Sequence, residues 1–102
     1  MIPELSEHRK EIEKLCIRLS VRRLELFGSA AIADELPAES DLDFLVEFGP
    51  LPPGTYADTY FALRESLEEL FGRPVDLVVA SAIKNPYFRE SIARTKALLY
   101  AA

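Results

Sequence analysis

Residues 41–48 are the stretch of this 102-residue chain that most constrains its fold. They read DLDFLVEF, a run rich in the branched and aromatic side chains that are enriched in β-strands. Side chains along a strand alternate between its two faces, so Asp41 and Asp43 share one face while Leu42, Phe44 and Val46 take the other. Successive residues on one face lie roughly 6.5–7 Å apart along the strand. The segment therefore predicts a strand with one apolar face and a pair of carboxylates on the opposite face.

Apolar spacing and turn residues predict further elements on both sides of this strand. Helical spacing of apolar residues, together with proline and glycine at the ends, predicts helices over 5–19, 30–35, 55–71 and 86–96. Strand patterns cover 21–27 and 75–79, whereas 97–100 fits either a short final strand or a continuation of the last helix. Because helices alternate with strands, we expect an α/β fold, with a small mixed sheet of three or four strands flanked by helices. A chain of this length has room for one domain, covering residues 1–102.

Composition and charge narrow the classes of partner. The chain is 49% hydrophobic and 28% charged, as expected for an ordinary folded domain. Its net charge of −5 argues against a broad basic face for direct nucleic-acid binding. Cys16, the single cysteine, lies on the apolar stripe of the first helix and cannot form an internal disulfide, which fits a reducing compartment. No apolar run has the length of a bilayer-spanning helix and no signal-peptide pattern is present, so we expect a cytoplasmic protein without membrane contact.

Two more features complete a candidate site around the paired aspartates. The strand over 21–27 ends at Gly28 and Ser29, a corner of the kind that presents backbone amides to a phosphate. Asp76 stands between apolar residues in the strand over 75–79, where a buried carboxylate without a partner would cost several kcal/mol. A metal ion would supply that partner. Asp41 and Asp43 could converge on two Mg2+ ions about 3.5–4 Å apart, and magnesium prefers such oxygen ligands.

Each feature also has a structural explanation. Asp41, which follows a serine, could satisfy loose backbone amides at the entry to the strand. Asp43 could face solvent on a half-exposed sheet, and Asp76 could pair with Arg73. A Gly-Ser corner after a strand is common on its own. The combination of an amide-rich turn, a same-face pair and a third carboxylate is more specific, because all three belong to one phosphoryl-transfer mechanism.

The motif Leu26-Phe27-Gly28-Ser29, followed by SDLDFLV at residues 40–46, resembles the signature of the minimal nucleotidyltransferases. These are small members of the DNA polymerase beta-like nucleotidyltransferase superfamily, and the likeness covers nearly the whole chain. Members are commonly the antitoxin of a toxin–antitoxin pair whose toxin is a HEPN-domain ribonuclease. The resemblance implies Mg2+-dependent transfer of AMP from ATP to a hydroxyl, such as that of a tyrosine in the toxin. It also implies a hetero-oligomer with that toxin.

The resemblance also assigns roles to the candidate residues. Gly28 and Ser29 would bind the nucleotide triphosphate. Asp41 and Asp43 would ligate both metal ions. Asp76 would hold the metal that activates the attacking hydroxyl and could help to remove its proton.

The chain departs from the family pattern just after the Gly-Ser corner. Where the family usually has an arginine and then a glycine, three and four residues past the serine, this sequence has Ile32 and Ala33. An arginine there would be expected to help neutralise phosphate or support the loop. A second hypothesis is therefore an inactive or weakly active transferase fold that neutralises the toxin by binding alone. A third is a small-molecule transferase of the aminoglycoside-modifying type, although such enzymes usually carry a further acceptor-binding domain.

Overall fold

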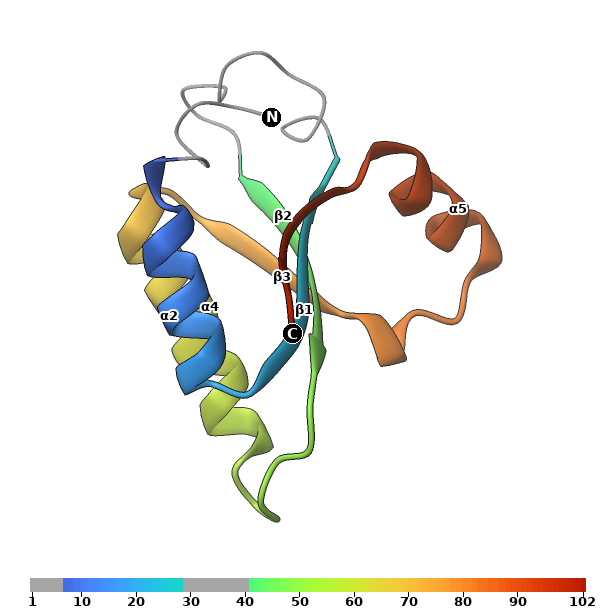
Figure 1. Ribbon diagram of the computed structural model, residues 1–102. Helices are drawn as coiled ribbons and strands as arrows, with labels where there is room; N and C mark the ends of the chain where they lie inside the picture. Colours follow the sequence, from blue (N-terminus) through green and yellow to red (C-terminus); the bar gives the residue numbers. More distant parts are fainter. Residues whose placement is uncertain (1–6, 29–40) are drawn as a thin grey trace.

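The computed structural model describes residues 7–28 and 41–102, which form a four-stranded sheet with helices on both faces (Figure 1). Figure 1 shows α2 and α4 side by side on one side of the sheet and α5 on the other. The elements in chain order are α2 (Arg9–Arg18), β1 (Val21–Phe27), β2 (Leu42–Phe48), α4 (Tyr56–Phe71), β3 (Val75–Val79), the 3-10 turn η1 (Ala80–Ala82), α5 (Pro86–Thr95) and β4 (Ala97–Ala101).

The sheet is mixed, as expected, and its strand order is β3-β2-β1-β4. β1 pairs antiparallel with both β2 and β4, whereas β2 and β3 run parallel and are connected through α4. The last segment is therefore a strand, which settles the alternative left open by its sequence. The helix predicted over 30–35 lies outside the described residues. Among the helices that the structure describes, none combines the length and apolarity needed to cross a bilayer.

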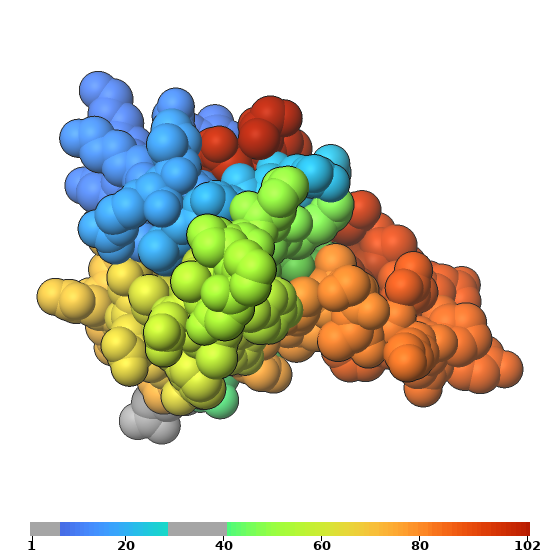
Figure 2. Space-filling model, turned by 90° about the horizontal axis from the view of Figure 1, so that it is seen from below, coloured from blue at the N-terminus to red at the C-terminus, as the bar shows by residue number. Residues whose placement is uncertain are grey.

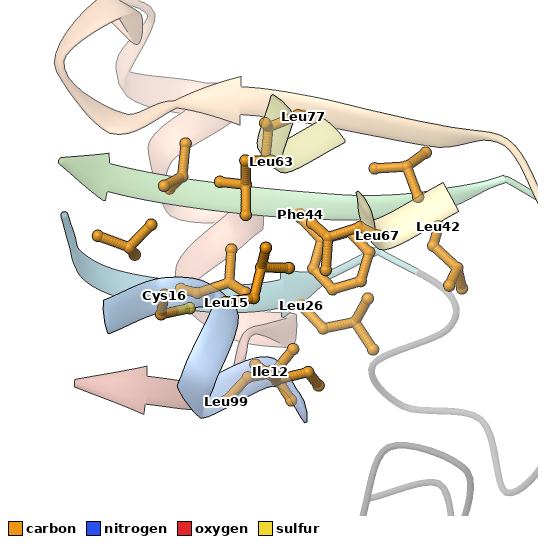
Figure 3. Packing of buried hydrophobic residues seen from close by; sticks show 14 of the residues in the cluster. Ile12, Leu15, Cys16, Leu26, Leu42, Phe44, Leu63, Leu67, Leu77 and Leu99 are labelled. Atoms are coloured by element: carbon orange, nitrogen blue, oxygen red, sulfur yellow. The ribbon is translucent and has the colours of Figure 1, made fainter. Parts of the chain in front are cut away.

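The main core lies between the sheet and the helix pair α2 and α4 (Figure 3). The apolar face predicted for β2 is confirmed, because Leu42 and Phe44 are fully buried. Leu63 and Leu67 of α4 and Cys16 of α2 pack in the same cluster and are also fully buried. Burial raises the pKa of the Cys16 thiol to about 12, so this cysteine remains protonated and serves as a small apolar side chain.

The opposite face of the sheet is covered only in part, by α5 and the turn before it. A second, smaller cluster there joins Phe27 of β1 to Ile83 and to Ile92 of α5. Ile92 is the one buried residue of this ten-residue helix. The segment around α5 forms a lobe that stands out from the body of the molecule (Figure 2). Within residues 7–28 and 41–102, no helix covers the rest of this sheet face, which includes the acidic side of β2.

Candidate active site

The acidic side chains of β2 and β3 lie next to each other on the sheet face opposite the main core. Asp43 of β2 is directly in register with Asp76 of the parallel strand β3. In-register neighbours point to the same face, and adjacent strands lie about 4.8 Å apart. Asp41 precedes β2 by one residue and is exposed. The topology thus brings a residue far along the chain to the paired aspartates that the sequence predicted.

The electrostatics show that the three carboxylates interact. The pKa of the Asp43 carboxyl is raised above its ordinary value, first by burial and then by the negative charges of Asp76 and Asp41. Each of these causes disfavours the charged form of Asp43. A cation bound between the carboxylates would relieve the repulsion, because an opposite charge within a few ångström favours ionisation.

The prediction that Asp76 is buried is wrong, because its side chain is exposed. Val75 and Leu77, its neighbours in sequence, are buried against the main core. β3 is the edge strand of the sheet, and alternation turns Asp76 toward the open face. A bound cation is therefore favoured by like-charge repulsion at Asp43, and not by an unpaired carboxylate in the interior.

The donor set fits magnesium only as part of a larger coordination shell. In residues 7–28 and 41–102, no group of three or more His, Cys, Asp or Glu side chains is arranged so that it could hold a metal ion by itself. The candidate ligands are all carboxylate oxygens, which suit Mg2+, an ion that usually binds through one or two carboxylates plus substrate phosphates. The residues present thus fit magnesium ions that bind together with a nucleotide, whose phosphate oxygens would complete their coordination shell.

Gly28 lies directly against the carboxylate of Asp43. Its φ of +77° is in the left-handed region, and a Cβ added there would lie 2.7 Å from Asp43 Oδ2. Real Cβ atoms essentially never approach another atom so closely, so a larger residue here would strain the backbone and displace either the Asp43 carboxylate or the corner. The corner predicted from the sequence is therefore in contact with the acidic site. Ser29, its predicted partner in nucleotide binding, lies outside the described residues, as do Ile32 and Ala33.

Two polar groups on this face were not predicted from the sequence. The Gly28 N–H donates a hydrogen bond of 3.2 Å to Oγ1 of Thr95, at the end of α5 and 67 positions away in sequence. Glu25 of β1 is buried, with Arg23 Nε 3.1 Å and Lys96 Nζ 3.5 Å from its carboxylate oxygens. Both groups depend on contacts between distant segments, so no local pattern could reveal them.

We expect the loss of Glu25 and the loss of its two cationic partners, Arg23 and Lys96, to lower stability by different amounts. Replacing both Arg23 and Lys96 by glutamine is expected to lower the free energy of unfolding by about 3 kcal/mol, since a buried carboxylate would lose both cations. The single change Glu25→Gln should cost only about 1 kcal/mol, because the two half-exposed cations can turn to water. Urea unfolding of both variants measures the difference. Equal losses would contradict a buried charge as the controlling group.

A cavity of about 470 Å³ lies at the other end of β2 from the aspartates. Phe48, Tyr56 and the loop between them form much of its wall. Glu47, which also lines it, is four residues beyond Asp43 on the same strand. The cavity is thus separate from the acidic cluster, and the candidate chemistry lies on the open sheet face.

The fold and site define a class: a small mixed sheet carrying an Asp-x-Asp strand, a third aspartate on the adjacent strand and a glycine corner packed against them. This is the arrangement that the sequence predicted for a metal-dependent nucleotidyl-transfer site. A family model for the nucleotidyltransferase domain matches residues 5–99. The chain therefore belongs to the nucleotidyltransferase domain family.

Known relatives agree with this assignment. The protein adenylyltransferase MntA of Thermococcus cleftensis is 37% identical over 81 residues, which cover 79% of this chain and 75% of the relative. The solved structure of a minimal nucleotidyltransferase is 33% identical, with a TM-score of 0.72 over 91% of this chain and 90% of that one.

A further solved structure shares the fold at lower identity. It is a tri-AMPylated Shewanella oneidensis HEPN toxin in complex with MNT antitoxin, at 17% identity and a TM-score of 0.64. The match covers 96% of this chain and 73% of that one. At this identity the likeness shows that the fold is the same.

Proposed function

We propose that this protein is a Mg2+-dependent protein adenylyltransferase that acts as an antitoxin in the cytoplasm. It transfers AMP from ATP to a hydroxyl, such as a tyrosine hydroxyl, of a HEPN-type ribonuclease toxin with which it forms a hetero-oligomer. The observation that carries the proposal is the cluster of Asp43, Asp76 and Asp41, whose mutual repulsion calls for cations, directly beside Gly28. Residues 1–102 act as one domain in this proposal.

In this reaction each site residue has its own role in a single substitution at the α-phosphorus of ATP. The acceptor oxygen forms a bond to the α-phosphorus of ATP as the bond to pyrophosphate breaks. Gly28 and Ser29 hold the triphosphate, and Asp41 and Asp43 would hold two Mg2+ ions. Asp76 lies on the open edge of the site, where it would hold the metal next to the acceptor and take up the hydroxyl proton. When bound, Mg2+ supplies neutralisation of the phosphate charge and favours loss of that proton.

Relatives support the choice of acceptor and partner. MntA of Thermococcus cleftensis is named a protein adenylyltransferase, and the Shewanella oneidensis antitoxin is in complex with an AMPylated HEPN toxin. A related toxin–antitoxin structure contains AMP-PNP, an analogue of ATP. The net charge of −5 of this chain would also favour a basic partner.

Intact-mass spectrometry tests the proposal. The purified chain is incubated with ATP, Mg2+ and the product of the neighbouring gene, which this function predicts to be a HEPN-domain protein, and the mass of that product is measured over time. The expected result is a gain of one or more AMP groups that depends on Mg2+ and is lost on adding EDTA. A partner whose mass stays constant at every nucleotide and metal concentration would contradict the transfer reaction.

Binding without catalysis is the second candidate, and it is favoured by Ile32 and Ala33 at positions where the family usually has arginine and glycine. This function predicts a stable complex in which the ribonuclease is inhibited without ATP and its mass is unchanged. The same incubation, followed by a ribonuclease assay with and without ATP, separates the two. Inhibition that requires ATP supports transfer, whereas inhibition in its absence supports masking of the toxin surface.

A further inference from the structure

One face of α5 packs against the end of β1, where Phe27 is followed by Gly28. Phe88, Ile92 and Thr95 follow one another at spacings of four and three residues, so they lie along the same side of the helix. The ring of Phe88 makes an edge-to-face contact with the ring of Phe27, with centroids 6.1 Å apart. Ile92 is buried in the same cluster as Phe27. Thr95 completes this side of the helix with its hydrogen bond to the N–H of Gly28.

The hydroxyl of Thr95 is itself held in place by its own helix. Oγ1 lies 3.3 Å from the carbonyl oxygen of Ser91 and 3.5 Å from that of Ile92, to which it can donate its proton. Threonine commonly bonds in this way to the carbonyl one turn earlier, which leaves its lone pairs free to accept. The hydroxyl therefore acts as a fixed acceptor for the Gly28 N–H. The Gly28 amide is consequently occupied, so Gly28 would contribute to triphosphate binding through the conformation of the corner and not through its own N–H.

Gly28 is thus constrained from two directions. Thr95 binds its amide on the α5 side, while the carboxylate of Asp43 occupies the space where a side chain would begin. Its left-handed φ is a conformation that glycine leaves easily, because glycine has no Cβ to restrict it. Without the hydrogen bond, the corner would sample other conformations and the spacing between Gly28 and Asp43 would vary.

We propose that Thr95 is a positioning residue for nucleotide binding: its hydroxyl fixes the Gly28 peptide so that the phosphate-binding corner and Asp43 keep one relative arrangement. The inference rests on the proposed function, because it assumes that this corner receives the triphosphate of ATP. The corner holds the triphosphate in the bound substrate and in the transition state alike. Loss of the hydroxyl should therefore raise the KM for ATP and leave kcat nearly unchanged.

The decisive comparison is Thr95→Val against Thr95→Ser. Valine keeps the branched shape and removes the acceptor, whereas serine keeps the acceptor. We expect Thr95→Val to weaken binding of a fluorescent ATP analogue and to raise the KM roughly three- to tenfold, the usual range for one hydrogen bond. Thr95→Ser should restore binding to within about twofold of the natural protein. Exchange of the Gly28 amide proton, followed by NMR, should be faster only in the valine variant.

Thr59→Val is the matched control. Thr59 donates to the carbonyl of Thr55 at 2.8 Å, so it is a helical threonine with the same back-bond, but it belongs to α4 on the opposite face of the sheet. Its replacement removes the same kind of back-bond and should leave nucleotide affinity untouched.

Each outcome of the comparison decides the inference. Weaker binding in Thr95→Val, with recovery in serine and no effect in Thr59→Val, supports it. Equal affinity in Thr95→Val and the natural protein overturns it, as does an equal loss in the serine variant. A natural protein that binds no nucleotide would overturn the proposed function and this inference together, and that is seen before any variant is compared.

Discussion

Replacing Asp43 by asparagine is expected to abolish AMP transfer and at the same time to make the fold slightly more stable. The catalytic loss should be about a thousandfold or more, because the charge that holds a cation against the phosphates would be gone. The side chain keeps its size, so packing against Gly28 is preserved. Transfer is measured as the rate of AMP addition to the HEPN partner by intact-mass spectrometry.

The gain in stability follows from the raised pKa of Asp43. Its folded pKa lies above its unfolded value, so the folded state binds more protons between these two values, and stability falls as the pH rises through this window. At pH values above the folded pKa, Asp43 is ionised, and its burial and the repulsion from its neighbours lower the stability of the fold. Asparagine removes this penalty, and the gain in the free energy of unfolding should be on the order of 0.5 kcal/mol for a charge so near solvent. Below the ordinary range of an aspartate the gain should vanish, which thermal unfolding at about pH 7 and about pH 3 would show.

Asp58→Asn is the control, because it removes the same negative charge at a different position. Asp58 is exposed in the first turn of α4, where a negative charge interacts favourably with the helix dipole. Its replacement should lower stability slightly and leave transfer unaffected. An Asp43→Asn variant that transfers AMP at nearly the natural rate would contradict the assignment of Asp43 to the site. A variant with unchanged stability at both pH values would contradict the repulsion between Asp43 and its acidic neighbours.

Much of the fold was predictable because its signals are local. Alternation along residues 42–48 depends only on the two-residue period of a strand, and the structure confirms the apolar face that it predicted. The last helix begins at Pro86, as predicted, and the Asn85 side chain accepts hydrogen bonds from two backbone N–H groups of the first turn. Gly72 ends α4 in the left-handed conformation. Such signals need no knowledge of the rest of the chain.

The parts that the sequence did not reveal depend on how distant segments meet. Asp76 looked buried because its neighbours are apolar, but its burial depended on whether β3 is a central or an edge strand. The burial of Glu25 requires Lys96, which comes from the connection between α5 and β4. The hydrogen bond from Gly28 to Thr95 joins residues 67 positions apart in the sequence. The three aspartates could be predicted from the sequence, whereas the contacts that Thr95 and Lys96 make beside them could not.

Gly28→Ala is the second change with a large expected effect, since it acts on the contact between the glycine corner and Asp43. An alanine Cβ would lie 2.7 Å from Asp43 Oδ2, so either the carboxylate or the corner must move. A displacement of about 1 Å at a reacting centre can cost about a hundredfold in rate, and we expect a loss of that size in AMP transfer. The left-handed φ adds a penalty of about 1 kcal/mol to the folded state. Transfer and urea unfolding measure the two effects separately.

Gly54→Ala separates backbone strain from displacement of the carboxylate. Gly54 has a φ of +80°, nearly that of Gly28, but a Cβ added there would meet nothing within 4 Å. It lies in the loop before α4, so alanine should impose the same loss of stability without disturbing Asp43. If Gly54→Ala and Gly28→Ala lose stability alike and only Gly28→Ala loses transfer, the contact with Asp43 is what the reaction requires. Equal transfer in both variants would show that Asp43 does not depend on the corner, and that the glycine serves only the turn.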